Sequence, residues 1–356
     1  MSKELSLREL LEYTVSHKAS DLHIGEKTRA SIRVDGDLEY FSDTVFSREQ
    51  ILKLIRECLP ENRFEVFKKD RELDFSFGIE NLGRFRANLF YQREAIGCAI
   101  RALPTKPMTF EEVGLPVAVA ESLVSKPTGL ILLTGATGSG KTTTLASMID
   151  YINQNDPCHI VTIEDPIEFV CENKKSKIDQ REVGSDTHSF NEALRHVLRQ
   201  DPDVILIGEM RDLETIATAL MVAETGHLVF ATLHTPDTVQ SVNRIIDVFP
   251  AHQQQQIRVQ LSFVLQAIIS QQLLKKNGGG LALAAEILLM NPAIRNLIRE
   301  SKSHQIYSSL QMGQKEGMKT FNMSLVELVK AQKVSREMAL ERSPDISELE
   351  KMLLSK

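Results

Sequence analysis

Cysteine is scarce in this chain of 356 residues, and tryptophan is absent. The cysteines lie far apart, and no Cys-x-x-Cys pair exists that would suggest a zinc ribbon or a redox dithiol. Scattered single thiols are typical of proteins from a reducing compartment. Glycine (18) and proline (12) are too few for a low-complexity or collagen-like chain. The composition therefore predicts a globular protein that folds without disulfide bonds.

Long hydrophobic runs and an excess of basic charge are missing as well. The apolar stretch Leu281–Met290 is interrupted by Glu286 and is shorter than the ~18 residues that a membrane span needs. The first residues, Met1–Leu5, offer no apolar signal segment. A formal net charge of −6 argues against a protein whose main role is to coat nucleic acid. We therefore expect a cytoplasmic protein with no nucleic-acid partner.

The first hundred residues are predicted to form a small α+β domain over residues 1–103. Apolar residues at helical spacing predict a helix over Leu7–Val15 and another over Arg48–Cys58 that stops at Pro60. Alternating apolar residues predict strands, with Asp35-Gly36 as the turn of a hairpin. The predicted strands are Ala19–Ile24, the two arms of the hairpin Ser31–Leu38, Leu73–Gly78 and Arg84–Tyr91.

Residues 104–107 are predicted to be a linker, because their two X-Pro steps favour extended backbone. Beyond them the pattern predicts an α/β domain over residues 108–356. Apolar strand cores alternate with helices, as in a parallel sheet that is covered on both faces. After Pro250 we expect an almost wholly helical region, over about residues 251–356. The predicted strands are Leu130–Leu133, Ile160–Ile163, Val204–Ile207 and Leu228–Thr232.

A glycine-rich segment follows the first of these strands and matches G-x-x-x-x-G-K-[ST] in full. Backbone N–H groups of such a loop surround phosphate oxygens at a helix N-terminus. Lys141 is expected to reach the β- and γ-phosphates, and the Thr142 hydroxyl to ligate Mg²⁺. The predicted nucleotide-binding residues are Gly135, Ala136, Thr137, Gly138, Ser139, Gly140, Lys141 and Thr142, with Thr143 opening the helix.

The other predicted strands carry polar side chains at their ends. Glu164 follows one strand, Glu209 follows the next, and His227 and His234 bracket a third. Because ligands bind at the carboxyl ends of strands in open parallel sheets, these groups are candidates for one site. In-line hydrolysis needs a carboxylate near the metal ion and a second one that orients the attacking water. The alternative is that the carboxylates solvate loops or cap helices and that the histidines are structural.

The ordered set of these motifs resembles that of the secretion ATPases, the ring-forming motors of type II secretion and type IV pili. One segment, Ala293–Glu300, is similar to the signature of the pilus-retraction branch. Pro236 departs from the family pattern, in which Asn is expected. The other matching segments are the glycine-rich loop, Glu164–Glu168 as the Asp box, Asp201–Glu209 as the Walker B motif, Thr225–His234 as the His box, and Ser20–His23, Arg84–Asn88 and Arg101–Pro104 in the first domain.

This resemblance implies a PAS-like N-terminal domain, a RecA-like P-loop ATPase domain and a homo-hexamer that uses ATP and Mg²⁺. It assigns Glu164 to polarising the attacking water, and it assigns Glu209, together with Thr142, to binding Mg²⁺. Asp is the more usual acid at the position of Glu209. Lys141, His227 and His234 complete the expected catalytic set.

The function expected from the resemblance is to power retraction, or disassembly, of the type IV pilus in twitching motility. The motor would lie in the cytoplasm, peripherally associated with the inner membrane at the pilus base. Its partners would be an inner-membrane platform protein and, in some systems, a second retraction ATPase.

Cations at a subunit boundary are also expected, because a γ-phosphate contacted by a neighbour couples hydrolysis to motion. Arg84, Arg86 and Arg101 of the first domain are candidates for this contact, as are Arg195 and Arg199 of the second. The alternative is that they are surface charges.

Residues 293–300 form an amphipathic pattern. We expect Ile294, Leu297 and Ile298 to anchor a helix, and Arg295 and Arg299 to remain free for a partner.

Other functions remain as alternatives to retraction. A pilus-assembly or type II/IV export ATPase is the main one, but such relatives often carry a longer N-terminal region and a four-cysteine zinc element, which this sequence lacks. A DNA-transfer motor fits the acidic net charge less well. A small-molecule kinase would need an acceptor pocket, for which no motif is present, and a non-hydrolysing switch is the alternative that is not an enzyme.

Overall fold

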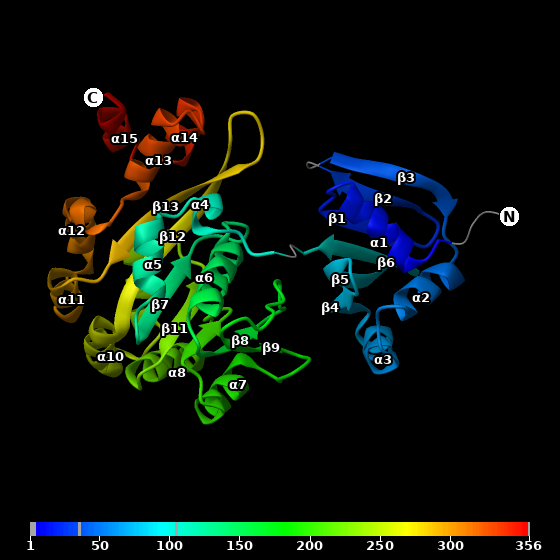
Figure 1. Ribbon diagram of the computed structural model, residues 1–356, viewed down its shortest axis with the longest axis horizontal. Coiled ribbons are helices and arrows are strands. Elements are labelled where there is room, and N and C mark those ends of the chain that lie inside the picture. The colour runs from blue at the N-terminus through cyan, green and yellow to red at the C-terminus, as the bar shows by residue number, and fades with distance from the viewer. Residues whose placement is uncertain (1–4, 35–36, 104–105, 355–356) are drawn as a thin grey trace. The chain divides into compact units, whose positions relative to one another are not determined.

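A computed structural model describes residues 5–34, 37–103 and 106–354 of the chain (Figure 1). The chain divides into two compact units. The first unit comprises residues 1–106 together with 166–170, and the second comprises 107–165 together with 171–356. The turn expected at Asp35-Gly36 and part of the expected linker, residues 104–105, lie outside the described residues.

The first unit contains a six-stranded antiparallel sheet in the order β3-β2-β1-β6-β5-β4. Three helices pack on one face of this sheet, where their leucine, isoleucine and phenylalanine side chains form one core with the strands. The helices are α1 (Leu7–Ser16), α2 (Arg48–Arg56) and α3 (Glu61–Asp70), and the strands are β1 (Asp21–Gly25), β2 (Arg29–Val34), β3 (Asp37–Val45), β4 (Glu72–Ile79), β5 (Gly83–Gln92) and β6 (Ala95–Ala102).

Two elements of this unit differ from the sequence prediction. Pro60 does not only end a helix: it is the N-cap residue of α3, which buries Phe64 and Phe67 in the core. A proline is tolerated at a helix start because the first N–H groups have no partner within the helix. The unpredicted strand β6 lies between β1 and β5, where small residues such as Gly97 and Cys98 pack closely.

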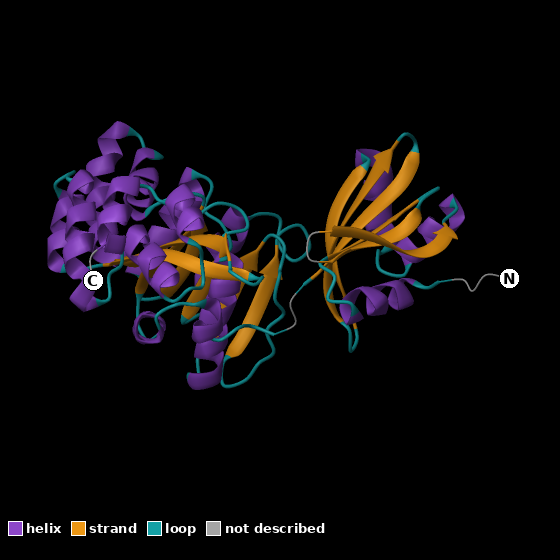
Figure 2. Ribbon diagram, turned by 90° about the horizontal axis from the view of Figure 1, so that it is seen from above, coloured by secondary structure: helices purple, strands orange, loops and turns teal. Residues whose placement is uncertain are grey.

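The second unit contains a seven-stranded sheet in the order β13-β12-β7-β11-β10-β8-β9, flanked by helices (Figure 2). All neighbouring strands are parallel except the pair β12 and β13. Alternate residues of the strands other than β9 join different cores, as expected for a sheet that is covered on both faces. The strands are β7 (Gly129–Thr134), β8 (His159–Glu164), β9 (Lys177–Glu182), β10 (Val204–Ile207), β11 (Leu228–Leu233), β12 (Leu265–Lys275) and β13 (Leu281–Leu289).

The helices that cover the two faces come from different parts of the chain. One core contains residues of α4 (Phe110–Val113), α5 (Val117–Val124) and α6 (Lys141–Asn155). The other core contains residues of α7 (Phe190–Val197), α8 (Leu213–Glu224), α9 (Thr238–Asp247), α10 (Ala251–Val264), α11 (Pro292–Arg299) and α12 (Ile306–Met312). A smaller core joins β12 and β13 to α13 (Phe321–Lys330), α14 (Arg336–Arg342) and α15 (Ile346–Leu354).

The prediction of an almost wholly helical region over residues 251–356 is wrong, because β12 and β13 interrupt it. Ala267, Ile268 and Ile269 are buried on alternating faces beside β7, and this tertiary pairing overrides the helix propensity of the Ala- and Leu-rich segment. Gly278–Gly280 all have positive φ and form the turn between the two strands.

The outer edge of β13 is paired as well. Ile287 exchanges two backbone hydrogen bonds with Lys319, of 2.8 and 3.0 Å, and the N–H of Ala285 donates to the Ser324 hydroxyl at 3.1 Å. This edge therefore does not offer a free row of N–H and C=O groups at these residues.

Candidate functional site

The glycine-rich loop joins the buried strand β7 to helix α6 at the carboxyl edge of the seven-stranded sheet. Gly135, Gly138 and Gly140 all have positive φ, and Gly140 is the N-cap residue of α6. A Cβ atom at Gly135 would collide with the carbonyl oxygen of Gln271 on β12. The backbone can follow this path only with glycine at that position, and it forms the curled loop that the sequence motif predicts.

Lys141 lies at the centre of this loop. It is 8% exposed, and its ammonium donates to the carbonyl oxygens of Gly135 at 2.8 Å and Ala136 at 3.0 Å. Ser139 is also buried, whereas residues 136–138 are exposed at the tip and Thr142 and Thr143 are half-buried in the first turn of α6. The predicted segment therefore has the shape of an anion-binding loop with a cation inside it.

Glu164 is the last residue of β8 and is 9% exposed. Its Oε1 atom accepts hydrogen bonds from the Thr162 hydroxyl at 2.6 Å and from the Gln180 side-chain amide at 3.2 Å. Thr162 and Glu164 point to the same face of the sheet as Ile160, which belongs to the core under α6. The structure therefore places Glu164 at the strand edge and on the sheet face from which the loop and α6 start.

Glu209 and His234 meet at the ends of the adjacent strands β10 and β11. Glu209 Oε1 lies 3.2 Å from His234 Nε2, and Glu209 Oε2 accepts a hydrogen bond of 2.8 Å from Arg211. The hydrogen bond from Arg211 lowers the pKa of Glu209, as does His234, while partial burial opposes them. The Glu209 carboxylate is thus held ionised next to an imidazole.

His227 does not join this group within its own chain, and its catalytic role stays a prediction. It precedes β11, and its carbonyl oxygen accepts from the N–H of Gly129, the first residue of β7. Its Nδ1 lies 3.1 Å from the carbonyl oxygen of Val222. One strand of six residues, roughly 17 Å, separates this edge of the sheet from the loop.

The three arginines predicted to contact a nucleotide, Arg84, Arg86 and Arg101, lie on the face of the first unit's sheet that is opposite the helices. Arg86 and Arg101 are cross-strand partners, Arg101 donates to Asp21 at 2.8 Å, and Arg84 donates to Ser76 at 2.9 Å. Against the effect of burial, hydrogen bonds from Ser20 and Arg101 lower the pKa of Asp21. The structure therefore gathers these arginines on one polar surface within the first unit.

The expectation for the arginines of α11 is wrong for Arg295. Ile294 and Ile298 are fully buried as predicted, and Leu297 is half-buried. Arg295 is also half-buried, and its guanidinium donates to the carbonyl oxygens of Ser262 at 2.5 Å and Phe263 at 2.9 Å. Arg295 is thus part of the fold and is not free for a partner.

Arg299 is half-buried as well, and its guanidinium lies 6.0 Å from the centre of the Phe263 ring. Its contacts are weaker than those of Arg295.

Three residues around the carboxylates were not selected from the sequence. Thr162 and Arg211 each lie two residues from a predicted carboxylate, and strand alternation could have pointed to Thr162. Gln180 could not have been found, because β9 was not predicted. The described residues contain no group of three or more His, Cys, Asp or Glu side chains that could hold a metal ion, and none of the described helices is long and apolar enough to cross a membrane.

Comparisons with known proteins agree with these features. Residues 3–343 match the family model described as type II/IV secretion system protein. The chain is 48% identical to the type IV pilus retraction ATPase PilT of Pseudomonas aeruginosa over 95% of this chain and 98% of that protein. It is 47% identical to a twitching motility protein of Neisseria gonorrhoeae over 88% of this chain and 83% of that protein. The crystal structure of the pilus retraction motor PilT with bound ADP superposes with a TM-score of 0.92 at 50% identity, covering 98% of this chain and 100% of that one.

Proposed function

The chain belongs to the type II/IV secretion system protein family, and from that membership we propose that it is an ATP-hydrolysing motor that powers retraction of type IV pili. The observation that carries the proposal is the glycine-rich loop around Lys141, at the same sheet edge as Glu164 and the Glu209–His234 pair, in a chain similar to a retraction ATPase over 95% of its length.

The architecture that goes with this proposal is a PAS-like domain over residues 1–103, a linker at 104–107 and a RecA-like ATPase domain over 108–356. The antiparallel six-stranded sheet with helices on one face supports the first assignment. The parallel strands with a phosphate-binding loop at their carboxyl ends support the second.

Binding of ATP would begin at the loop. Lys141 would exchange its two carbonyl partners, Gly135 and Ala136, for oxygens of the β- and γ-phosphates, because a phosphate oxygen carries more negative charge. The curled backbone would donate its N–H groups to the same phosphates. The chain would thus supply a positively charged loop whose backbone is curled before the nucleotide arrives.

Hydrolysis would then depend on the strand-end groups. Glu164 would take the proton of the attacking water, since its carboxylate is already oriented by hydrogen bonds from Thr162 and Gln180. His234 would report on the γ-phosphate through its contact with Glu209. These two groups come from β8 and β11, so the site responds to the positions of several strands.

Mg²⁺ fits the residues near the loop. It usually takes one or two protein ligands and completes its shell with phosphate oxygens and water, so it does not require a cluster of acids. The Thr142 hydroxyl, at the start of α6, and the Glu209 carboxylate would hold it. When bound, Mg²⁺ would neutralise charge on the phosphates.

A homo-hexamer would complete the site. Head-to-tail contacts form a ring when the rotation between copies closes. Arg84, Arg86 and Arg101 of one copy would then reach the nucleotide of the next. The ring would lie at the cytoplasmic side of the inner membrane and act on the platform protein at the pilus base, in some systems with a second retraction ATPase.

Two measurements test the proposal. Purified wild-type protein should hydrolyse ATP in a Mg²⁺-dependent reaction, and Lys141→Ala should abolish this turnover because it removes the cation of the loop. In cells, deletion of the gene should leave pili that do not retract. Cells without pili would instead indicate an assembly or export ATPase, and normal retraction with lost DNA transfer would indicate a DNA-transfer motor.

A further inference from the structure

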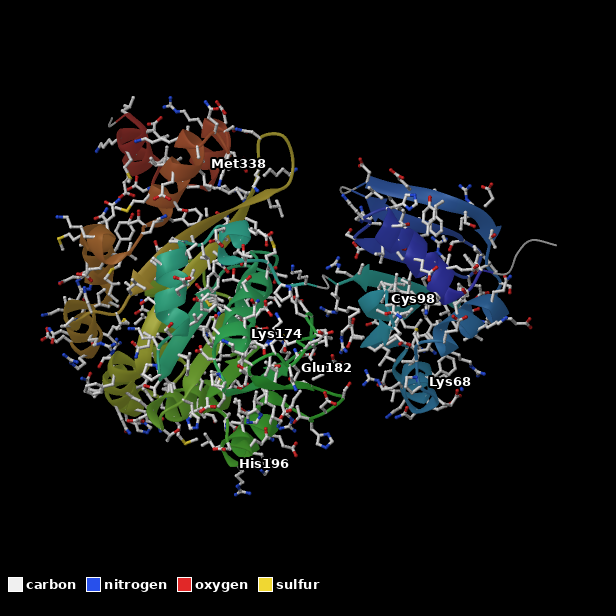
Figure 3. The ribbon with its side chains drawn as sticks, in the orientation of Figure 1. Lys68, Cys98, Lys174, Glu182, His196 and Met338 are labelled. Carbon is white, nitrogen blue, oxygen red and sulfur yellow. The ribbon has the colours of Figure 1, made fainter. Side chains whose placement is uncertain are left out.

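Strand β9 places a second row of polar side chains beside the proposed catalytic carboxylate. In the parallel pairing of β8 and β9, Thr162 lies opposite Gln180 and Glu164 lies opposite Glu182. All four side chains therefore point to the same face of the sheet. Figure 3 labels Glu182 at the end of β9, in the second unit. Within this row, Gln180 contacts both the Glu164 carboxylate and Cys171, which lies in the loop before β9.

The orientation of the Gln180 amide is fixed by its two partners. Its Oε1 accepts a hydrogen bond of 2.7 Å from the backbone N–H of Cys171, which can only donate. Its Nε2 therefore faces Glu164 and donates to Oε1 of that carboxylate at 3.2 Å. A flipped amide would place its NH₂ group against the Cys171 N–H and its oxygen against the Glu164 oxygen, and it would lose both bonds.

The same Glu164 oxygen has a second donor. The hydroxyl of Thr162, which is 1% exposed, donates to Glu164 Oε1 at 2.6 Å. Two donors converging on one carboxylate oxygen favour the ionised form and fix the rotation of the side chain. The nearby Cys171 thiol adds no charge, because burial, together with the charge of Glu164, raises its pKa to about 12.

We propose that Gln180 is a positioning residue for ATP hydrolysis, which holds Glu164 Oε1 so that the carboxylate faces the water that attacks the γ-phosphate. The proposal rests on the role given above to Glu164. A base aligned by neighbouring hydrogen bonds loses rate, and not substrate affinity, when those bonds are removed. The competing explanation is that Gln180 only tethers the loop at Cys171.

One substitution at this position separates the explanations, and a second removes both contacts for comparison. Gln180→Glu keeps an oxygen that accepts from the Cys171 N–H, but it replaces the donor to Glu164 with a like charge. Gln180→Met keeps the size of the side chain and removes both bonds. Asn173→Leu is the matched control, because Asn173 Oδ1 accepts from the N–H of Ile178 in the same loop, so its loss perturbs a loop tether alone.

The experiment measures kcat and KM for Mg-ATP with the full-length chain. We expect Gln180→Glu and Gln180→Met each to lower kcat by roughly 10–100-fold, the value of a hydrogen bond to a charged group, with KM for ATP changed less than about twofold. Asn173→Leu should keep the wild-type kcat. Thr162→Val, which removes the other donor, should lower kcat in the same way and provides the test if a charge at position 180 prevents folding.

The outcomes distinguish this inference from the function on which it rests. A wild-type kcat for folded Gln180→Glu would overturn the positioning role and leave the loop tether as the explanation. If Glu164→Gln is inactive while the Gln180 and Thr162 variants are normal, the positioning role alone is refuted. If Glu164→Gln itself turns over ATP normally, the role given to Glu164 fails, and the positioning role fails with it.

Discussion

We expect Arg295 of α11 to stabilise the fold, because its side chain caps the C-terminal end of a different helix, α10. Helix α10 ends at Val264 and β12 begins at Leu265, so no loop residues are available to cap the last turn. The last carbonyl groups of a helix have no partner within it. The guanidinium of Arg295 takes two of them, those of Ser262 and Phe263, and places a positive charge at the negative end of the helix.

The loss of unfolding free energy expected for Arg295→Ala follows from these contacts. Hydrogen bonds from a charged donor contribute about 1.5–3 kcal/mol, and a cation at a helix C-terminus contributes about 0.3–1 kcal/mol at a partly exposed site. Arg295→Ala should therefore lower the free energy of unfolding by about 2–4 kcal/mol, which shifts the Tm of a domain of this size by roughly 5–15 °C. Arg299→Ala removes a distant contact with the Phe263 ring and an exposed hydrogen bond of 3.4 Å to Asn296, and it should cost less than ~1 kcal/mol.

Chemical denaturation of the two variants and the wild type, with thermal unfolding as a second probe, measures this difference. Arg295→Lys is an intermediate control, since it keeps the charge but lacks the fork that reaches two carbonyl groups at once. An Arg295→Ala protein within ~0.5 kcal/mol of the wild type would refute the capping argument. It would also restore Arg295 as a candidate contact for a partner.

Three further predictions concern the loop and the carboxylates of Glu164, Glu209 and Glu286. Gly135→Ala should prevent nucleotide binding, because its Cβ would collide with the Gln271 carbonyl oxygen at a positive φ, and a normal ATP titration by fluorescence would contradict this. Glu209→Gln should weaken nucleotide binding and, together with it, the Mg²⁺ dependence of turnover. Glu164→Gln should still bind ATP but fail to hydrolyse it, with a loss of ~10²–10⁴-fold in rate. If the two variants show the reverse behaviour, the roles given to Glu164 and Glu209 must be exchanged. Burial raises the pKa of Glu286, so its contribution to stability is fully present below the usual pKa and is lost as the pH rises through the raised value. Unfolding free energies from pH 4 upward should therefore fall relative to those of Glu286→Gln, and parallel curves for the two proteins would refute this.

The parts of the site that could be predicted are those encoded by short contiguous segments. The loop from Gly135 to Thr142 needs only its own glycines and the strand and helix on either side of it. Glu164 and Glu209 follow from the rule that strand ends meet at one edge of a parallel sheet. Local sequence is sufficient wherever geometry is set by adjacent residues.

The parts that could not be predicted depend on chain direction or on distant partners. His227 and His234 lie at opposite ends of one strand, and only His234 lies at the carboxyl end, beside Glu209. Gln180 and Arg295 act through segments that lie apart in sequence, and each contact requires a register or packing that no local pattern encodes. The strands β12 and β13 were missed because neighbouring strands, and not their own propensities, stabilise them.

The two outer strands of the seven-stranded sheet bear on how copies of this chain can associate. At β13, Lys319 and Ser324 already form hydrogen bonds with backbone groups of Ile287 and Ala285. At β9, every second side chain is charged, namely those of Lys177, Asp179 and Arg181. Exposed strand edges can pair with strands of other molecules and lead to irreversible aggregates. The hydrogen bonds already formed at β13 and the charges along β9 both oppose such pairing. In an assembly that holds several copies at high local concentration, contacts made by this sheet would therefore have to run through side chains and not through strand pairing. Side-chain contacts of this kind can form and break without fusing two sheets.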